Sequence, residues 1–501
     1  MQELDTPSQA AQWLRQRVSG VLTADSRRVQ PGDGFIAWPG AAVDARQFVA
    51  AAFQQGAKAS LVERSGLEAY VLNDFNVASY RGLKSDTGAI AAEFFGAPSG
   101  QLAVVAVTGT NGKTSTAWWL AQALSALPAH HGLACGVIGT LGVGHPPGEV
   151  TTTGMTTPDP VLLQQTLRQM ADSDLKACAI EASSIGIEEH RLGGTQIRVA
   201  VFTNFTQDHL DYHGSMEAYW QAKQKLFAWP GLASVVINVD DPMGATLAQA
   251  AYASALDVWT VSRQQAARLQ ARDMGYGALG LQFEVVEGDA AVLLQTRMIG
   301  DYNISNLLGV LAAMRSLGVP LQEAVGVCAT LNPVPGRMEC LGGVDAPLVA
   351  VDYAHTPDAL GQALAALRTL ATQRGGRLWC VFGCGGDRDA SKRPLMGAIA
   401  AQQADQVVVT SDNPRSEKPE AIVAQVLLGM TEGMEVGVQV DRALAIAEVM
   451  TRAADCDVIL LAGKGHEDTQ EAAGVKHPFS DRAHAQRALL ARHAARLGGA
   501  V

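Results

Sequence analysis

A short glycine-rich loop with a single lysine directly follows an apolar stretch, in the segment Thr108-Gly-Thr-Asn-Gly-Lys-Thr114. Gly109 and Gly112 allow the backbone to approach a polyphosphate closely, and the ammonium group of Lys113 can reach its outer phosphates. The hydroxyl of Thr114 can bind a magnesium ion. The general phosphate-loop pattern has its first glycine five residues before Gly112, where this chain has a strand valine. An ordinary glycine turn capped by a threonine is therefore the alternative.

Two further polar clusters follow apolar stretches. Glu181 comes directly after residues 177–180, and a carboxylate at the end of a parallel strand is a ligand that Mg²⁺ prefers. His209 belongs to a segment with two histidines and two aspartates, residues 208–213, which follows the apolar stretch 199–202. For His209 alone, a purely structural histidine is the better interpretation. Together with Glu181 and the lysine of the glycine loop, the cluster indicates contact with a metal ion or a phosphate.

These polar residues need a scaffold that brings several strand ends to one edge. From residue 102, short aliphatic stretches alternate with helical ones, which predicts a mostly parallel sheet with helices on both faces. After the turn-rich segment 332–337 the alternation starts again. The sequence thus predicts an α/β protein of three domains: a small mixed α/β N-terminal domain (1–98), a central domain with the phosphate loop and a mostly parallel sheet (99–337), and a Rossmann-like α/β C-terminal domain (338–501).

The apolar runs place the predicted strands. In the central domain they are residues 102–107, 177–180, 199–202 and 234–238, and in the C-terminal domain residues 348–351, 378–382, 407–409 and 458–462. In the N-terminal domain we expect strands at residues 35–38 and 59–62 and a helix near residues 46–55. Ligands of such sheets bind at the carboxyl ends of the strands, where the unusual polar residues of this chain cluster.

Three polar loops follow predicted strands of the C-terminal domain. They are residues 383–389, residues 412–415 with the sequence Asp-Asn-Pro-Arg, and residues 463–467. Because the carboxyl ends of parallel strands share one edge, we expect these loops to converge on one crevice. A guanidinium group binds a carboxylate through two hydrogen bonds, so Arg415 is expected to recognise a carboxylate of the ligand. A proline turn with a surface arginine is the alternative.

Composition and charge limit the possible classes of protein. The 501-residue chain has a net charge of −11, which argues against a general nucleic-acid-binding surface. No stretch approaches the length and apolarity of a membrane span, and the first 14 residues lack the features of a secretory signal. Seven scattered cysteines are typical of reduced thiols. We therefore expect a cytoplasmic protein. Independently of composition, we expect a monomer that acts on small molecules.

Several segments together resemble the Mur ligases, the ATP-dependent amide ligases that build the peptidoglycan peptide. These segments span nearly the whole chain and comprise Thr108–Thr114, Glu181-Ala-Ser-Ser184, Asp208-His-Leu-Asp211, Tyr219-Trp-Gln-Ala-Lys223 and Pro335-Gly-Arg-Met-Glu339. Near the N-terminus, Asp25-Ser-Arg27 resembles the first domain of the family's third-step enzyme, which binds the uridine end of a UDP-linked substrate.

The resemblance implies a ligase that adds meso-2,6-diaminopimelate to the D-glutamyl side chain of UDP-N-acetylmuramoyl-L-alanyl-D-glutamate. ATP, with Mg²⁺, first phosphorylates the side-chain carboxylate, and the amine then displaces phosphate from the acyl phosphate. The Asp-Asn-Pro-Arg segment is similar to the family's signature for diaminopimelate. An L-lysine-adding ligase is one alternative, against which Arg415 argues. A folylpolyglutamate synthase-like ligase is another, although it is not expected to carry the Asp-Ser-Arg domain. A nucleotide-binding scaffold without turnover would not need Lys113, Glu181, His209 and Lys223 together.

The resemblance also implies roles for individual residues. The catalytic residues are Lys113, Glu181, His209, Lys223 and Arg337. The metal ligands are Thr114, Glu181, His209 and Lys223, the last as a carbamylated lysine. ATP is bound by Gly109, Thr110, Asn111, Gly112, Lys113, Thr114, Asn303 and Asn306. The UDP-muramoyl dipeptide is bound by Ser26, Thr156, Thr157, Ser184, Arg191 and Lys223, and diaminopimelate by Arg388, Asp412, Asn413, Arg415, Gly463 and Glu467.

Other interpretations stay open for some of these residues. Lys223 can be an unmodified, solvated lysine, and asparagines such as Asn303 and Asn306 also cap helices. The family commonly has a histidine after the paired serines, where this chain has Ile185. Any role of that histidine is therefore absent or belongs to another residue, such as His190.

Overall fold

The computed structural model describes residues 1–498 except residues 41–42, 73, 147, 278–279, 344 and 431–435. These residues form two compact units, each assembled from separate stretches of chain. Unit 1 comprises Met1–Asn204, Trp220–Leu269 and Gly309–Val327, and unit 2 comprises Phe205–Tyr219, Gln270–Leu308 and Cys328–Val501. Among the described residues, no helix combines the length and apolarity that crossing a membrane requires.

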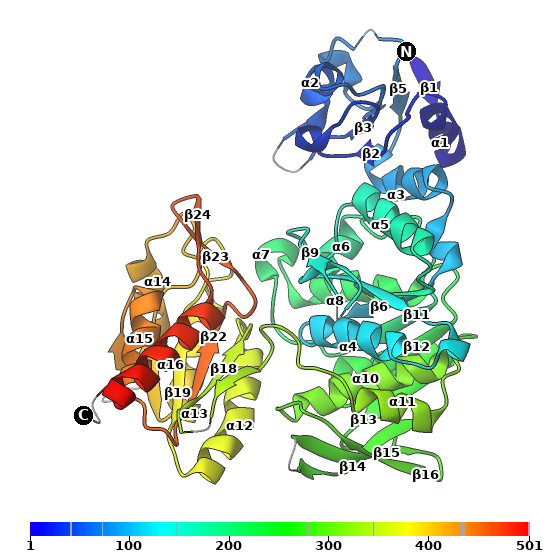
Figure 1. Ribbon diagram of the computed structural model, residues 1–501. Helices are drawn as coiled ribbons and strands as arrows, with labels where there is room; N and C mark the ends of the chain where they lie inside the picture. Colours follow the sequence, from blue (N-terminus) through cyan, green and yellow to red (C-terminus); the bar gives the residue numbers. More distant parts are fainter. Residues whose placement is uncertain are drawn as a thin grey trace. The chain divides into compact units, whose positions relative to one another are not determined.

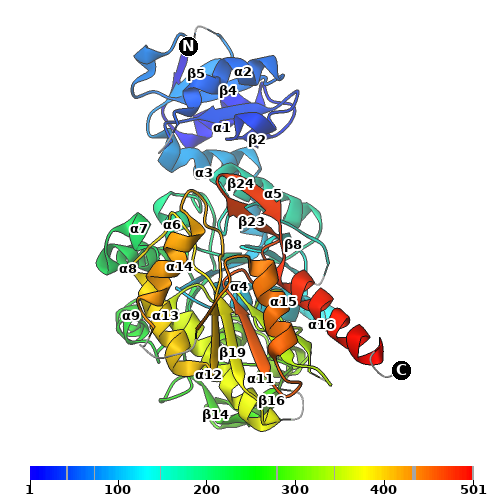
Figure 2. The ribbon, with the colours of Figure 1, turned by 90° about the vertical axis from the view of Figure 1, so that its left-hand side faces the viewer.

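The N-terminal part of unit 1 is a small parallel sheet covered on both faces. Its elements are β1 (Gln2–Leu4), α1 (Pro7–Arg15), β2 (Leu22–Thr23), β3 (Gly34–Ala37), α2 (Val49–Gln54), β4 (Ala59–Glu63), β5 (Val77–Tyr80) and α3 (Leu83–Phe94). The strand order is β1-β5-β4-β3-β2, and every neighbouring pair is parallel. Apolar residues of α1 and α3 form a core with one face of the sheet, and those of α2 form a core with the other (Figure 2). The two predicted strands are confirmed, and the predicted helix begins as a 3₁₀ turn, η2 (Ala45–Phe48), before α2.

The larger part of unit 1 contains the predicted central sheet (Figure 1). Its elements are β6 (Ala103–Thr108), α4 (Lys113–Ser125), β7 (Cys135–Gly139), β8 (Gly142–Gly144), β9 (Val150–Thr151), α5 (Pro160–Asp172), β10 (Ala177–Glu181), α6 (Ser184–Glu188), β11 (Val199–Phe202), β12 (Ser234–Asn238), α9 (Pro242–Tyr252), β13 (Asp257–Ser262) and α11 (Leu321–Cys328). The strand order is β13-β12-β11-β6-β10-β7-β8-β9, and pairing is parallel from β13 to β7. All four predicted strands are confirmed, with β6 shifted by one residue. The carboxyl ends of β6, β10 and β11 are therefore neighbours.

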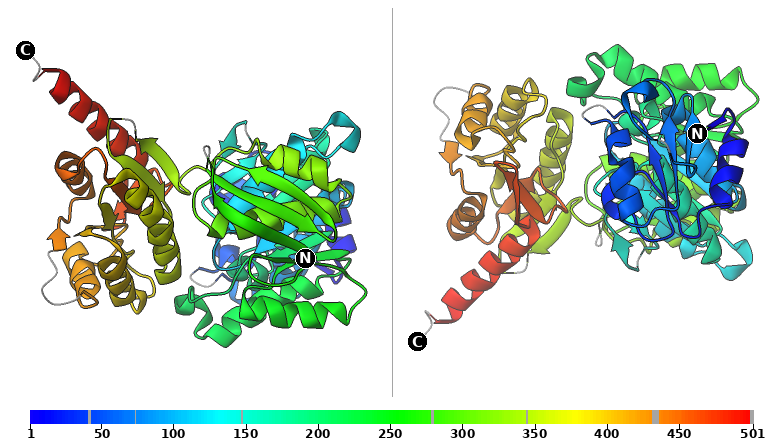
Figure 3. Two further views of the ribbon diagram at one scale, coloured as in Figure 1. Left: turned by 90° about the horizontal axis from the view of Figure 1, so that it is seen from below. Right: turned by 90° about the horizontal axis from the view of Figure 1, so that it is seen from above.

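Unit 2 contains a second α/β sheet. Its elements are β17 (Glu339–Gly342), β18 (Leu348–Asp352), α12 (Pro357–Arg374), β19 (Leu378–Phe382), α13 (Lys392–Gln403), β20 (Gln406–Val409), α14 (Pro419–Leu427), β21 (Val436–Val438), α15 (Arg442–Arg452), β22 (Val458–Ala462), β23 (Thr469–Ala472), β24 (Val475–Pro478) and α16 (Asp481–Gly498). The order is β17-β18-β22-β19-β20-β21, and only the β17–β18 pair is antiparallel. The four predicted strands are confirmed, and α16 leads away from this sheet in both views of Figure 3.

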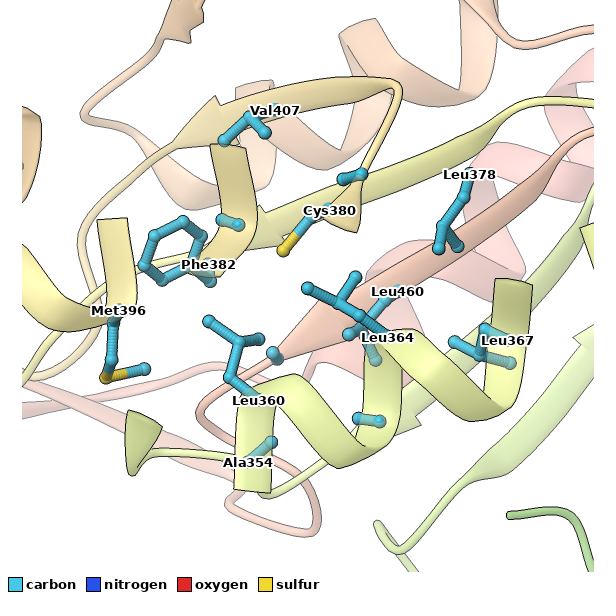
Figure 4. Close-up of a cluster of buried hydrophobic side chains, with 14 of the residues drawn as sticks. Ala354, Leu360, Leu364, Leu367, Leu378, Cys380, Phe382, Met396, Val407 and Leu460 are labelled. Carbon is cyan, nitrogen blue, oxygen red and sulfur yellow. The ribbon is translucent and has the colours of Figure 1, made fainter. Parts of the chain in front are cut away.

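Strand β19 shows why the sequence forms a sheet that is covered on both faces. Leu378, Cys380 and Phe382 point into a core formed with Leu360, Leu364 and Leu367 of α12 (Figure 4). The alternate residues, Trp379 and Val381, belong to a second core that includes Ile446 and Val449 of α15. Because successive side chains of a strand point to opposite faces, a strand buried on both sides must be apolar throughout. The sheet can therefore offer polar groups only at the ends of its strands.

Further elements link these parts of the chain. They are α7 (Leu210–His213), α8 (Met216–Gln224), β14 (Leu269–Tyr276), β15 (Leu281–Glu287), β16 (Ala290–Gln295) and α10 (Tyr302–Ser316). β14 pairs antiparallel with β15, and β15 with β16; these three strands were not among the predicted ones.

Candidate active site

The glycine loop lies between β6 and α4, as predicted. Gly109 has a φ of 148°, and a Cβ there would overlap the hydroxyl group of Thr203. Gly112, with a φ of 84°, caps α4, whose first residue is Lys113. The Nζ of Lys113 donates to the carbonyl oxygens of Gly109, at 2.9 Å, and Thr110, at 2.7 Å. The loop thus presents the N-terminus of a 13-residue helix, which favours an anion.

Asn204 holds this loop in place, although the sequence had not singled it out. Its Oδ1 accepts a hydrogen bond from the N–H of Asn111 at 2.8 Å, and its Nδ2 donates to the Asn111 carbonyl oxygen at 3.1 Å. Its own carbonyl oxygen accepts from the N–H of Thr110 at 2.9 Å. What could have identified Asn204 in the sequence is its position just after strand β11, which lies beside β6 in the sheet.

Glu181 and Thr114 meet at the end of β10. The Thr114 hydroxyl donates to Glu181 Oε2 at 2.9 Å, and both side chains are buried. The other carboxylate oxygen accepts from the N–H of Thr140 at 2.7 Å, which fixes the orientation of the carboxylate. A hydroxyl and a carboxylate at this separation are two hard oxygen donors, so the pair fits the ligand preference of Mg²⁺.

Lys223 is buried beside the same loop. Only 1% of its surface is exposed, and its Nζ donates to the Gly109 carbonyl oxygen at 2.7 Å. Lys113 donates to this same oxygen at 2.9 Å, so two lysine nitrogens lie close together. The structure thus brings together four predicted residues: Lys113, Thr114, Glu181 and Lys223.

The residues predicted to bind the muramoyl dipeptide lie in two places. Thr157 donates to the Glu181 carbonyl oxygen at 2.7 Å, and Arg191 donates to the Thr157 carbonyl oxygen at 3.0 Å. Thr156 contacts the hydroxyl of Thr140 at 3.0 Å, and the buried Ser184 begins α6. These four residues therefore surround the end of β10. Ser26 lies instead in the N-terminal sheet region, in the 3₁₀ turn η1 (Ser26–Arg28).

His209 and the two asparagines belong to unit 2. His209 has a φ of 53° and precedes α7, and its Nε2 lies 3.4 Å from Oδ2 of Asp208. Burial of Asp208 would raise its pKa, but the charges of His355, His209 and Lys392 outweigh burial and lower the pKa to about 2. Asp208 is therefore an anion at neutral pH.

Asn303 and Asn306 lie next to each other on α10, and both are buried. The Asn306 Nδ2 donates to Asn303 Oδ1 at 2.9 Å, and the Asn303 Nδ2 donates to the Ile299 carbonyl oxygen at 2.7 Å. These bonds fix the orientation of both amides.

Three residues of the C-terminal loops form a hydrogen-bonded cluster. Asn413 Nδ2 donates to Glu467 Oε2 at 2.8 Å. The fully buried Lys464 donates to the same carboxylate oxygen, at 2.8 Å, and to Asn413 Oδ1, at 3.1 Å. Lys464 also lies 3.7 Å from Asp412 Oδ1. The N–H of Gly386, in the third loop, donates to the Asn413 carbonyl oxygen at 2.9 Å, so the predicted convergence of the three loops is observed. Lys464, which the sequence analysis had not selected, lies at the centre of the cluster.

The backbone of Gly463 approaches the carboxylate of Asp412. Gly463 has a φ of 112°, and a Cβ there would lie 2.7 Å from Asp412 Oδ2. Burial raises the pKa of Asp412, and the charges of Lys464 and Arg442 oppose that rise.

Arg388, the remaining residue predicted to bind diaminopimelate through a cation besides Arg415, is exposed, and its NH1 lies 3.9 Å from Oδ2 of Asp211.

Arg415 adopts a backbone conformation that is unfavourable for an arginine. Its φ is 51°, in the left-handed region. Its N–H donates to the Glu471 carbonyl oxygen at 3.0 Å, and its carbonyl oxygen accepts from the N–H of Ala473 at 2.7 Å. The hairpin β23–β24 therefore holds this conformation, and the guanidinium NH1 donates to the Gly386 carbonyl oxygen at 2.7 Å.

Arg337 lies over an aromatic ring near the Glu467 loop. Its guanidinium carbon is 4.4 Å from the ring centroid of Tyr353, and its NH1 is 3.4 Å from Nδ1 of His466. Burial, with a further contribution from Arg337, lowers the pKa of His466 to about 3. His466 is therefore neutral, and its unprotonated Nδ1 can accept a hydrogen bond from Arg337.

The fold and the glycine loop are those of a phosphate-loop α/β protein, and comparison with known proteins gives the family. The Mur ligase middle domain matches residues 107–314, and a domain described as "Mur ligase, glutamate ligase domain" matches residues 336–465. The chain belongs to the Mur ligase family.

Curated relatives and a solved structure agree with this assignment. The chain is 60% identical, over 98% of both chains, to a UDP-N-acetylmuramoyl-L-alanyl-D-glutamate–2,6-diaminopimelate ligase of Acidovorax sp. (strain JS42). A protein of the same name from Janthinobacterium sp. (strain Marseille) is 46% identical over 94% of both chains. A solved structure of a ligase with this name is 36% identical and has a TM-score of 0.64, covering 94% of this chain and 95% of the other.

Proposed function

We propose that this chain is an ATP-dependent ligase that adds meso-2,6-diaminopimelate to the D-glutamyl side chain of UDP-N-acetylmuramoyl-L-alanyl-D-glutamate, a step of peptidoglycan precursor synthesis. The observation that carries the proposal is the 60% identity over 98% of the chain with a relative of that name. The cluster of Asn413, Lys464 and Glu467 beside Arg415 supports the same amino-acid substrate.

The reaction has two steps. The γ-phosphoryl group of ATP passes to an oxygen of the D-glutamyl carboxylate, which releases ADP and leaves an acyl phosphate. The amine of diaminopimelate then attacks the carbonyl carbon, loses a proton and expels phosphate. Lys113 and the N-terminus of α4 would stabilise the charge of the transferring group, and Arg337 would contact the nucleotide phosphates. Thr114 and Glu181 would hold one Mg²⁺. His209 would hold a second ion near the acceptor carboxylate, and the carbamate of Lys223 would supply an anionic oxygen ligand. When bound, Mg²⁺ neutralises charge on the phosphates.

Lys223 is proposed to act in its carbamylated form. Its unprotonated amine would attack CO₂ and lose one proton, which gives an anionic carbamate in place of a cation. Two ammonium groups that share the Gly109 carbonyl oxygen repel each other, and burial of Lys223 strengthens that repulsion because it lowers the local dielectric constant. Carbamylation removes that repulsion by giving Lys223 a charge opposite to that of Lys113. NMR of the chain in isotopically labelled bicarbonate, with Lys223→Arg as control, tests this form.

The C-terminal loops are proposed to choose the amino acid. Diaminopimelate has a carboxylate and an ammonium group at its far end, whereas L-lysine has only the ammonium group there. Arg415 would bind the extra carboxylate and Glu467 the ammonium group, with contacts from Arg388, Asp412, Asn413 and Gly463. Bound lysine would leave the guanidinium group of Arg415 without its anion, so discrimination is expected to be strong.

Release of phosphate from ATP tests this function. The chain is incubated with Mg²⁺ and UDP-N-acetylmuramoyl-L-alanyl-D-glutamate, with meso-diaminopimelate in one reaction and L-lysine in another. We expect release with diaminopimelate only. Release with lysine instead would reject the proposed amino acid and retain the ligase. Release with neither amino acid would reject the ligase function.

The remaining proposals concern organisation and setting. The domains would have the boundaries 1–98, 99–337 and 338–501, and Ser26, Thr156, Thr157, Ser184 and Arg191 would bind the UDP-linked substrate. The chain would act as a monomer in the cytoplasm. Light scattering coupled to gel filtration tests the oligomeric state, since a dimer mass would reject the monomer.

A further inference from the structure

Two adjacent histidines and a glutamate form a cluster at the opposite end of α4 from the phosphate loop. His130 and His131 belong to the 3₁₀ turn η5 (Ala129–His131), which follows α4 in the chain. Glu323 lies in the first turn of α11. One nitrogen of each imidazole and one carboxylate oxygen of Glu323 all lie within 4.8 Å of one another. Because α4 has 13 residues, it separates this cluster from the loop by about 20 Å.

The geometry of the cluster is close to that of a metal site. His131 Nε2 lies 2.8 Å from Glu323 Oε2, and the two imidazole ring centroids are 4.3 Å apart with an interplanar angle of 36°. Zn²⁺ and similar ions bind both imidazole nitrogen and carboxylate oxygen, at about 2.0–2.2 Å from the metal. Three ligand atoms already within 4.8 Å of one another need only side-chain adjustment to reach one ion.

An ion pair between His131 and Glu323 explains only part of the arrangement. That pair needs one histidine, whereas His130 places a second ring nitrogen near the same carboxylate. A divalent cation uses both rings in their neutral form and also neutralises Glu323.

We propose that His130, His131 and Glu323 form a binding site for a transition-metal ion of the Zn²⁺ type, separate from the Mg²⁺ site proposed for the ligase reaction. The site is open on one side, because His130 is exposed and 36% of the Glu323 side chain is accessible, whereas His131 is only 14% accessible. An ion can therefore reach the site, and water can complete its coordination. Imidazole ligands favour Zn²⁺, Ni²⁺ and Cu²⁺ over Mg²⁺.

Binding would join two separate segments of unit 1. A metal held by η5 and α11 links the turn that follows α4 to a helix almost 200 positions further along the chain. An ion that binds the folded chain and not the unfolded chain stabilises the fold by mass action. The melting temperature should therefore rise with Zn²⁺ concentration.

Calorimetric titration of the untagged, chelator-treated chain with Zn²⁺ in excess Mg²⁺ tests the site. We expect one tight site in the wild type and affinity more than about tenfold lower in His131→Gln and in Glu323→Gln, since even losing a partner outside the coordination sphere costs roughly 10–100-fold. His145→Gln is the matched control, because His145 belongs to the same part of unit 1 but contacts Ser125 Oγ, at 3.0 Å, and lies outside the cluster. The control should bind Zn²⁺ as the wild type does.

Two results would overturn the proposal. One is wild-type Zn²⁺ binding that persists unchanged in both cluster variants, since the ion would then sit elsewhere, for example at His209 or a thiol. The other is the absence of Zn²⁺ binding by the wild type. Far-UV circular dichroism establishes that each variant is folded, and the visible spectrum of bound Co²⁺ reports whether nitrogen and oxygen ligands surround the ion.

Discussion

Arg442 and Asp481 form a two-pronged ion pair in the interior of unit 2. Arg442 Nε donates to Asp481 Oδ1 at 2.7 Å, its NH2 donates to Oδ2 at 2.6 Å, and neither side chain is exposed. The same guanidinium also donates to the carbonyl oxygens of Ala462, at 2.8 Å, and Ser411, at 3.3 Å. These two carbonyls directly precede the loops that contain Gly463 and the Asp-Asn-Pro-Arg segment. One buried side chain therefore sets the separation of the two loops.

We expect Arg442→Lys to raise KM for diaminopimelate while KM for ATP stays nearly unchanged. Lysine keeps the charge but lacks the planar fork that reaches both carbonyls and the carboxylate. Arg452→Lys, on the same helix and at an exposed position, is the control. Equal changes in both KM values would contradict a positioning role.

Asp481→Asn should lower the free energy of unfolding by about 3–5 kcal/mol, because it leaves a buried charge without its partner.

Substitution of Arg415 by glycine should separate recognition from stability. Glycine adopts a φ of 51° without strain, so Arg415→Gly is expected to melt within a few degrees of the wild type. It should nevertheless lose most of its preference for diaminopimelate over lysine, because the guanidinium group is gone. Comparison of kcat/KM for the two amino acids provides the measurement. Arg415→Lys should also lose the preference, since an ammonium group cannot bind a carboxylate through two parallel bonds. An unchanged preference in either variant would reject the proposed role.

The stability of the chain should fall as the pH decreases from about 6.5 towards 3, and His466 should contribute to this fall. The folded-state pKa of His466 is lowered to about 3 by burial, with Arg337 adding to it, whereas the unfolded value is near 6.5. In this window the unfolded chain binds more protons than the folded chain, so acid favours unfolding. His466→Gln should show a shallower decrease. Urea unfolding at several pH values measures the free energy of unfolding, and an identical dependence of that free energy on pH in the two proteins would contradict the prediction.

Removal of the Thr114 hydroxyl should weaken the binding of the Mg²⁺ that the reaction needs. In Thr114→Val the oxygen that lies 2.9 Å from Glu181 Oε2 is lost, while the size of the side chain is kept. We expect the Mg²⁺ concentration for half-maximal phosphate release to rise by at least about tenfold. Thr116→Val, a buried threonine on the same helix, is the matched control and should behave as the wild type. Similar Mg²⁺ dependence in Thr114→Val and the control would reject Thr114 as a ligand.

Strands and their terminal polar residues could be predicted because their signals are local. β6 and β10 are apolar runs that end directly at Thr108 and Glu181, so the sequence indicated both the strand and the group at its tip. The hairpin β23–β24 was missed, since its turn is Ala473-Gly474 rather than the usual asparagine or aspartate before glycine. β14, β15 and β16 were also missed, although local signals are present: residues 281–285 alternate apolar and polar, and Gly288-Asp289 forms a two-residue turn between β15 and β16.

The supporting residues of the site could not be predicted, because they act across long separations in the chain. Arg442 pairs with Asp481 39 positions away, and Lys464 bonds to Asn413 51 positions away. A charged residue in an amphipathic helix normally faces solvent, so the sequence gives no reason to place Arg442 inside. The role of Asn204 could not be predicted for the same reason, because its partners belong to the glycine loop more than 90 positions earlier.

The hairpin β23–β24 supports its neighbouring loop through main-chain bonds at Arg415 and through the side chain of Gln470, whose Nε2 donates to Ser411 Oγ at 3.0 Å and to the Asp412 carbonyl oxygen at 2.5 Å. The bonds from the Arg415 N–H to the Glu471 carbonyl oxygen and from the Ala473 N–H to the Arg415 carbonyl oxygen involve no side chain. Positions of the hairpin other than Gln470 can therefore accumulate substitutions over evolutionary time without moving the loop. A descendant of this protein could thus acquire a different amino-acid preference through a single side-chain change, with the scaffold beneath it intact.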